Sequence, residues 1–432
     1  MQMTTVTPWM TTSRESYQDP GKAGRNATEE ARRAYHRNNA VQNPKTDPYL
    51  GRGWEVRFQT LPSDKCFAVK SNIDVQDIHT SLGVSGLSRM RDSNASAKVV
   101  QLLKNAGYTL AGITRMDQLA MGLSGIRDHT PPLNPLNPEY ITGGSSSGSA
   151  VVVANNDVPF ALGTDMAGSG RIPAAMTGII GLKPAMGVFS MEGVADACPG
   201  QDTVSVFSRS LDIAVDVYNT LAESSNNLSK LDNGQEINYS VPSNFLGKEI
   251  EDLDLFQEAM TILINKGGTK QDIDFTPFIK TGKCAFRAWG QDRYNAVKPY
   301  IEQQPPLNIH EKVLFLLKKA GSTTPDESAR KKAEVTTHIK AAEKAFNPNN
   351  VLVVPTVAKC FTVAKMREND NHNAALGEFV NFANIMDLAS ITIPFGRREN
   401  KIPFSLTLYV NKGSEQLLIN AASRLINHGN SL

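Results

Sequence analysis

Two neighbouring segments rich in glycine and serine decide how this 432-residue chain is interpreted: ITGGSSSGSA at residues 141–150 and GTDMAGSGRIPA at residues 163–174. Glycine weakens regular structure and adds no core volume, so two such turns indicate a requirement at the backbone. A flexible linker would not be followed directly by the apolar segments 150–154 and 158–162. The chemistry that fits is a serine nucleophile beside backbone N–H groups that stabilise an oxyanion.

Alternating apolar and amphipathic stretches predict an α/β fold. The patterns predict strands at residues 66–76, 108–113, 158–162, 351–355 and 402–410. They predict helices at residues 94–106, from 150–154, 255–265, 309–319 and 326–345, a surface loop at 223–238, and a helix at 28–39 in the polar N-terminal part. The succession of strand, helix and strand favours a parallel or mixed sheet with helices on its faces.

The composition excludes several classes of protein. A net charge of +2 argues against a nucleic-acid partner. The four cysteines are widely spaced, which fits reduced thiols, and no Cys/His spacing predicts a metal site. The chain shows neither a secretory leader nor an apolar segment of membrane-spanning length. We therefore expect a cytoplasmic protein that needs neither a cofactor nor a metal.

Ordered motifs resemble those of the amidase signature family, a group of serine hydrolases that act on amides. The glycine-serine turns at 143–148 and 163–174 are similar to the two turns of the family signature, and GLKP at 181–184 is similar to the motif that follows it. Upstream, FAVKSNID at 67–74 resembles the strand that carries the family's catalytic lysine. The order of these motifs along the chain is the one expected for the family, and this makes the resemblance specific.

The resemblance also implies an architecture. It implies the amidase signature fold, in which a central mixed, twisted sheet is covered by helices on both faces. Residues 1–60 are then expected to form an N-terminal helical or irregular segment, and residues 61–432 the amidase signature domain. We expect the second, C-terminal domain that allophanate hydrolases usually carry to be absent.

A serine needs a base before it can attack an amide. The seven histidines lie outside any motif, although a Ser-His-Asp triad is recognised by geometry rather than by order. Lys70 follows the apolar run 66–69, so its amine can be buried, and burial favours the neutral form that a base requires. The resemblance implies a Ser-cisSer-Lys triad, with Ser169 as nucleophile, Ser145 as the bridging serine in a cis peptide and Lys70 as base.

The resemblance implies further roles around this triad. The expected oxyanion hole consists of the backbone N–H groups of Met166, Ala167 and Gly168. The expected substrate-binding residues are Gly122, Leu123 and Arg293. Asp165 and Arg171 flank the second turn and are expected to hold it rather than to contact the substrate.

Several positions resemble the allophanate hydrolase branch of the family. They include Gly170 after the nucleophile and the segments 159–165, 274–278 and 376–384. In that branch an arginine matching Arg293 binds the substrate carboxylate, which suits a guanidinium. The branch's substrate-binding tyrosine corresponds here to Ala285, and this removes one hydrogen bond to the substrate.

The expected function is serine-dependent hydrolysis of a small ureide or carboxylate-bearing amide, with allophanate as the first candidate and ammonia as a product. One alternative is a glutaminase-type component of an amidotransferase complex, against which Gly170 and the segment 376–384 speak. Another alternative is an amidase-fold scaffold without activity, against which the intact triad speaks. The resemblance alone implies a homodimer. For the product of the reaction two alternatives stay open: either the C-terminal domain of allophanate hydrolases has been removed from this sequence, or another protein carries out that step.

Overall fold

Eleven strands form one sheet through the middle of the residues that the computed structural model describes. Those residues are 52–58, 64–85, 87, 94–223, 227–230, 234–243, 245, 249–302 and 307–426. In their order across the sheet the strands are β1 (Trp54–Arg57), β3 (Thr109–Thr114), β2 (Cys66–Lys70), β4 (Phe160–Asp165), β6 (Thr203–Ser208), β5 (Ile180–Lys183), β10 (Ala389–Gly396), β11 (Phe404–Val410), β9 (Val351–Pro355), β7 (Ile237–Pro242) and β8 (Gly268–Ile273).

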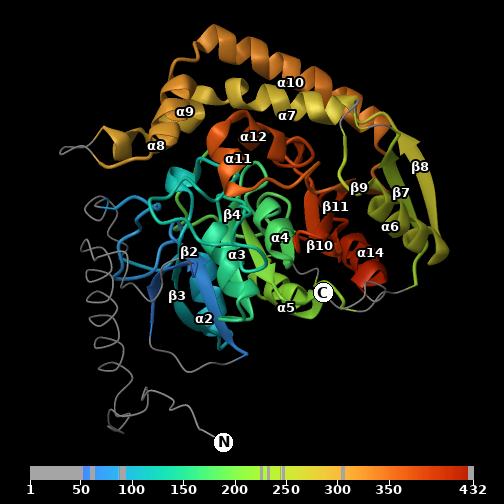
Figure 1. The fold of residues 1–432 in the computed structure, drawn as a ribbon, viewed down its shortest axis with the longest axis horizontal. Coiled ribbons are helices and arrows are strands. Elements are labelled where there is room, and N and C mark those ends of the chain that lie inside the picture. The colour runs from blue at the N-terminus through green and yellow to red at the C-terminus, as the bar shows by residue number, and fades with distance from the viewer. Residues whose placement is uncertain are drawn as a thin grey trace, which may run out of the picture.

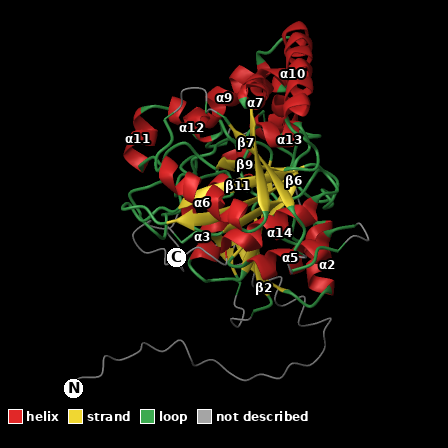
Figure 2. Ribbon diagram, turned by 90° about the vertical axis from the view of Figure 1, so that its right-hand side faces the viewer, coloured by secondary structure: helices red, strands yellow, loops and turns green. Residues whose placement is uncertain are grey.

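Helices lie on both sides of these strands (Figure 2). Four of them, α7 to α10, gather at one end of the molecule, at the top of Figure 1. The helices are α2 (Lys98–Asn105), α3 (Ser147–Ala154), α4 (Ile172–Thr177), α5 (Leu211–Leu221), α6 (Leu253–Asn265), α7 (Thr276–Ala288), α8 (Gly290–Ile301), α9 (Glu311–Gly321), α10 (Pro325–Ala345), α11 (Val363–Glu368), α12 (Asn371–Leu376), α13 (Phe382–Ile385) and α14 (Glu415–Ile426). Across the described ranges, none of the helices is long and apolar enough to cross a membrane.

The sheet is mixed. β2 runs parallel to β3 and β4, and β7 runs parallel to β8 and β9, whereas the other neighbouring strands are antiparallel. The predicted α/β fold with a mixed sheet between helical layers is confirmed.

The central strands are buried along their whole length. Every residue of β2, β4, β9 and β11 is buried. A strand that is covered on both faces favours a continuous apolar run over a strict alternation, and β9 (VLVVP) shows this most clearly. The candidate site lies at the carboxyl ends of two of these buried strands, β2 and β4.

The sequence predicts some element boundaries well and others poorly. β9 matches the strand predicted at 351–355, and α10 begins one residue before the helix predicted at 326–345. The strand predicted at 66–76 ends at Lys70, because the chain turns there and the Ile73 N–H donates to the Lys70 carbonyl oxygen. The helices α7 and α8 were not predicted.

The strand β1 falls within the expected N-terminal segment, residues 1–60. It pairs with β3 and is part of the sheet, and its residues Trp54 and Val56 are buried. The helix predicted at 28–39 lies outside the described residues.

Candidate active site

The ends of two neighbouring strands bring the sequence motifs together. β2 and β4 run parallel, with Val69 opposite Leu162, so that their carboxyl ends meet at the same edge of the sheet. Lys70 is the last residue of β2, and Asp165 is the last residue of β4. The first glycine-serine turn leads into α3 beside these strand ends, and the second turn follows β4 directly.

Lys70, Ser145 and Ser169 form one hydrogen-bonded chain. The Nζ of Lys70 donates to the Oγ of Ser145 at 2.7 Å, and this hydroxyl donates to the Oγ of Ser169 at 3.1 Å. The peptide bond between Gly144 and Ser145 is cis. Lys70 and Ser145 are fully buried, whereas Ser169 is 6 % exposed and lines a cavity. The three residues that the sequence predicts for catalysis therefore meet, with Ser169 at the accessible end.

The surroundings of Lys70 favour a neutral amine. Burial lowers its pKa from 10.5 to about 7, because the ammonium ion loses its hydration. The carboxylates of Asp117, Asp202 and Asp165 act in the opposite direction and offset only part of this effect. The Nζ also donates to the Oγ1 of Thr164 at 2.9 Å, a contact that the sequence did not predict. An appreciable fraction of Lys70 is thus unprotonated near neutral pH.

A buried ion pair holds the turn that carries Ser169. The Asp165 carboxylate accepts from the N–H groups of Gly168 and Gly170 at 2.9 and 2.8 Å. It also accepts from the Nη2 and Nε of Arg171 at 2.8 and 3.0 Å. Burial opposes ionisation of this carboxyl, but Arg171 outweighs that effect and lowers the pKa of Asp165 to about 2. Asp165 and Arg171 therefore hold the turn, as the sequence suggested.

The contacts of Asp165 change the expected oxyanion hole. Because the N–H of Gly168 donates to Asp165, it does not serve as an oxyanion donor in this arrangement. Gly168 is required for another reason: its φ is +118°, and a Cβ atom there would lie 2.6 Å from a methyl carbon of Val380. Met166 and Ala167 line the cavity beside Ser169, so their N–H groups remain the candidate donors.

A cavity of about 840 Å³ opens at Ser169. All three residues expected to bind substrate, Gly122, Leu123 and Arg293, line it. Cationic side chains outnumber anionic ones along its wall. The cationic residues are Arg127, Lys283, Arg287, Arg293, Lys312 and Lys319, and the anionic residues are Asp370 and Glu378. This balance of charge suits an anionic ligand.

Of the two buried cations of this wall, Arg127 is paired with Asp370, which leaves Arg293. It extends from α8, is 6 % exposed, and stacks its guanidinium 5.5 Å from the centre of the Phe286 ring. Among the described residues, its Nε has no hydrogen-bond partner. A buried guanidinium nitrogen of this kind can bind a carboxylate oxygen of a ligand.

Comparison with known proteins supports the assignment of a family. The family model described as Amidase matches residues 66–248. Urea amidolyase from Saccharomyces cerevisiae is 32 % identical over 377 residues, which cover 83 % of this chain and 20 % of the yeast protein. The chain belongs to the amidase signature family. It spans about a fifth of the length of this relative and of the urea amidolyase from Lachancea kluyveri.

Two further relatives bear on the branch of this family. The structure of selenomethionine-substituted Kluyveromyces lactis allophanate hydrolase superposes with a TM-score of 0.80 at 28 % identity, covering 95 % of this chain and 72 % of that chain. A component of the mitochondrial glutamyl-tRNA(Gln) amidotransferase from Yarrowia lipolytica is 40 % identical over 157 residues, 36 % of this chain and 34 % of that protein. The chain is therefore similar both to allophanate hydrolase and to a component of an amidotransferase.

Contacts that sequence motifs do not reveal complete the site. Asn384 accepts from Arg171 at 2.7 Å and donates to the carbonyl oxygen of Asp165, so it supports the nucleophile turn from α13. Ala285, at the position of the family's tyrosine, does line the cavity. Only the three-dimensional fold brings α13 and α7 to the motifs.

Proposed function

We propose that this amidase hydrolyses a small carboxylate-bearing amide or ureide, with allophanate as the first candidate, and releases ammonia. The observation that carries the proposal is the hydrogen-bonded chain from Lys70 through Ser145 to Ser169, which ends in a cavity lined by Arg293. The similarity to yeast urea amidolyase and to Kluyveromyces lactis allophanate hydrolase supports the choice of substrate.

The proposed reaction uses this chain of residues as a proton relay. When Lys70 is neutral, the two hydrogen bonds run in the reverse sense, with Ser169 donating to Ser145 and Ser145 donating to the free electron pair of Nζ. Lys70 then takes the proton of Ser145, which takes the proton of Ser169, and the Ser169 oxygen attacks the amide carbonyl carbon. The N–H groups of Met166 and Ala167 stabilise the negative oxygen of the tetrahedral intermediate. The relay then returns the proton to the leaving nitrogen, so that ammonia departs and an acyl-enzyme remains. Water, activated by the same relay, hydrolyses the ester and regenerates Ser169.

Ammonia release from a panel of amides tests the proposal. The panel contains allophanate, biuret, glutamine, malonamate and simple amides, with the Ser169→Ala variant as control. We expect turnover of allophanate that the variant lacks. Turnover of another amide instead would support the mechanism but show that allophanate is not the substrate. A folded chain that hydrolyses no amide would favour the inactive scaffold.

The amidotransferase alternative rests on one observation, the 40 % identity to the Yarrowia lipolytica protein over about a third of this amidase. In that case glutamine would be the substrate, and its hydrolysis would depend on a second protein. If the isolated chain hydrolyses allophanate faster than glutamine, that result counts against this alternative.

The proposed base predicts a dependence on pH. Because Lys70 must be neutral to accept a proton, kcat/KM is expected to fall about tenfold per pH unit below its pKa of about 7 and to level off above it. Burial also raises the pKa of Asp202 to about 7, so the Asp202→Asn variant is the matched control. Its profile should keep the acid limb, displaced to lower pH because the Asp202 carboxylate raises the pKa of Lys70 in the wild type. Constant kcat/KM between pH 5 and 8 would contradict the role of Lys70.

Binding of the substrate carboxylate by Arg293 predicts a selective effect on KM. The Arg293→Ala variant is expected to raise KM for a carboxylate-bearing amide by about 10- to 100-fold, since a hydrogen bond to a charged group contributes about 1.5–3 kcal/mol. For an uncharged amide of similar size, KM should change little. Arg330→Ala, at an exposed position of α10, is the control. Equal losses for charged and uncharged amides would show that Arg293 does not bind the carboxylate.

A further inference from the structure

One wall of the cavity is a helix whose other side carries a second cluster of reactive side chains. Gly282, Ala285 and Phe286 of α7 line the cavity. Cys284, between them in sequence, contacts α10 instead through a hydrogen bond from its thiol to Glu334. The two helices lie along each other at the top of Figure 1 and form the most extensive helix–helix contact among the described residues.

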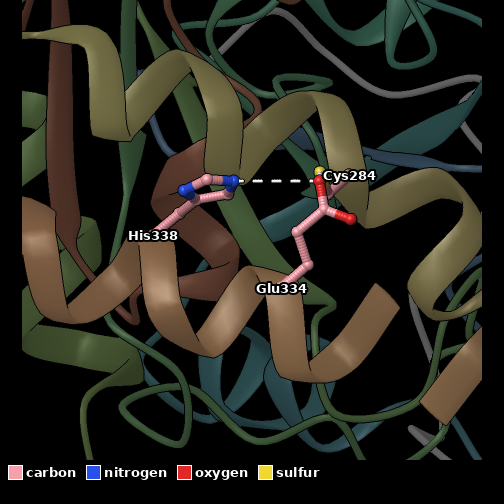
Figure 3. A group of neighbouring side chains, drawn as sticks. All are labelled: Cys284, Glu334 and His338. Atoms are coloured by element: carbon pink, nitrogen blue, oxygen red, sulfur yellow. Dashed lines mark hydrogen bonds and ion pairs between the residues drawn. The ribbon is translucent and has the colours of Figure 1, made fainter. Parts of the chain in front are cut away.

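Figure 3 shows the cluster that this contact creates, with Glu334 and His338 one turn apart on α10 and Cys284 on α7. The Sγ of Cys284 lies 3.0 Å from the Oε1 of Glu334, and this oxygen lies 3.8 Å from the Nε2 of His338. All three atoms lie within 4.8 Å of one another.

These separations suit one small ion. Zinc binds thiolate sulfur at about 2.3 Å and histidine nitrogen or carboxylate oxygen at about 2.0–2.2 Å, in tetrahedral geometry. Ligand atoms at those bond lengths lie about 3.3–3.7 Å apart around the ion. The separations of Glu334 Oε1 from Cys284 Sγ and from His338 Nε2, 3.0 and 3.8 Å, are near this range. Sulfur, nitrogen and a single carboxylate oxygen are also the donor types that zinc prefers.

The second oxygen of Glu334 is already held by a neighbour. Lys331, one turn earlier on α10, donates from Nζ to the Oε2 of Glu334 at 2.6 Å. This contact turns Oε1 toward Cys284 and His338 and leaves one oxygen for an ion. A hydrogen bond to the outer oxygen of a metal-binding carboxylate is a common supporting contact in metal sites.

We propose that Cys284, Glu334 and His338 bind one zinc ion, with a water molecule as the fourth ligand. All three side chains are partly exposed, so that the ion can enter from solvent and retain that water. On binding, the Cys284 thiol releases its proton to solvent, and no electron is transferred. Cys284 lies 50 residues before Glu334, so the spacing of Cys and His residues in the sequence does not predict this site, and no metal was expected.

The ion would link α7, which forms part of the cavity wall, to α10, which packs against the other side of α7. Because it bridges α7 and α10, it stabilises the folded state through mass action and fixes the position of the helix that carries Ala285 and Phe286. It lies on the side of α7 away from Ser169, so it has no part in the proposed proton relay. The zinc site is therefore independent of the proposed function, and a test of one does not decide the other.

Metal binding by the full, untagged chain provides the test. Zinc affinity is measured by competition with a chromophoric chelator, and Co²⁺ serves as a spectroscopic probe because a thiolate ligand gives a sulfur-to-cobalt charge-transfer band. We expect one zinc ion per chain, the charge-transfer band, and a rise in Tm on zinc addition. The Cys284→Ser and His338→Ala variants should each bind zinc about 100-fold more weakly or worse, and Cys284→Ser should lose the band.

The matched control is Cys360→Ser, which removes another partly buried thiol outside the cluster. It should retain wild-type affinity and the cobalt band. His338→Ala changes a part-exposed side chain and remains decisive if Cys284→Ser folds poorly. The proposal is overturned if the wild-type chain binds no zinc with micromolar or tighter affinity, or if both ligand variants bind as tightly as the wild type.

Discussion

Replacement of Ser169 by alanine is expected to lower kcat for ammonia release by about four to six orders of magnitude. Ser169 is the only member of the hydrogen-bonded chain of Lys70, Ser145 and Ser169 that lines the cavity, so it is the group that can reach an amide carbonyl. Removing its hydroxyl leaves the base without a nucleophile to activate, and the residual rate then depends on binding and the oxyanion donors alone. The rate is measured as ammonia released from saturating substrate.

The control for this variant is Ser322→Ala, at an exposed position directly after α9. It should retain the wild-type rate. The Ser169→Ala variant should also retain the wild-type Tm, because a single oxygen atom is removed beside a cavity. A variant that keeps more than a tenth of the wild-type kcat would contradict the role of Ser169.

Replacement of Arg171 by methionine is expected to lower the free energy of unfolding by about 3–5 kcal/mol. Arg171 and Asp165 are both fully buried, and the Asp165 carboxylate depends on this guanidinium for its compensating charge. Without it, a buried carboxylate remains unpaired at the turn that carries Ser169. Urea denaturation measures the loss, and activity should fall as well because the turn is no longer held.

The same variant has a predictable dependence on pH. The folded-state pKa of Asp165 is about 2, below its ordinary value of 3.8, so the stabilisation is complete above pH 4 and is lost as the pH falls towards 2. The difference in stability between wild type and Arg171→Met should therefore shrink in acid. Arg209→Met, which removes an exposed arginine, should change the free energy of unfolding by less than about 0.5 kcal/mol at any pH. An equally small change for Arg171→Met would show that the ion pair contributes little.

Much of the fold could be predicted because burial on both faces leaves a clear pattern in the sequence. β9 is an uninterrupted apolar run, and α10 begins with a proline after Thr324, whose hydroxyl accepts from the Glu327 N–H. α7 was missed because Gly282 interrupts it, and glycine argues against a helix. It is helical here because its apolar face packs into the core.

The sequence likewise predicts only part of the candidate site. Lys70 and Ser169 lie in short motifs whose chemistry can be argued from the residues themselves, whereas the role of Ser145 was implied by the family resemblance. The hydrogen bond that removes Gly168 from the expected oxyanion hole depends on how the Asp165 side chain is turned, and no spacing reveals that. Contacts such as that of Asn384 with Arg171 join residues more than 200 positions apart, so only the fold could supply them.

Covalent labelling with a fluorophosphonate, followed by peptide mapping, tests the central claim without requiring the right substrate. We expect a single adduct on Ser169, which forms more slowly below pH 7 and is nearly absent in a folded Lys70→Met variant. An adduct on another residue, or labelling of Ser169 at an unchanged rate in Lys70→Met, would contradict the proposed lysine-activated serine.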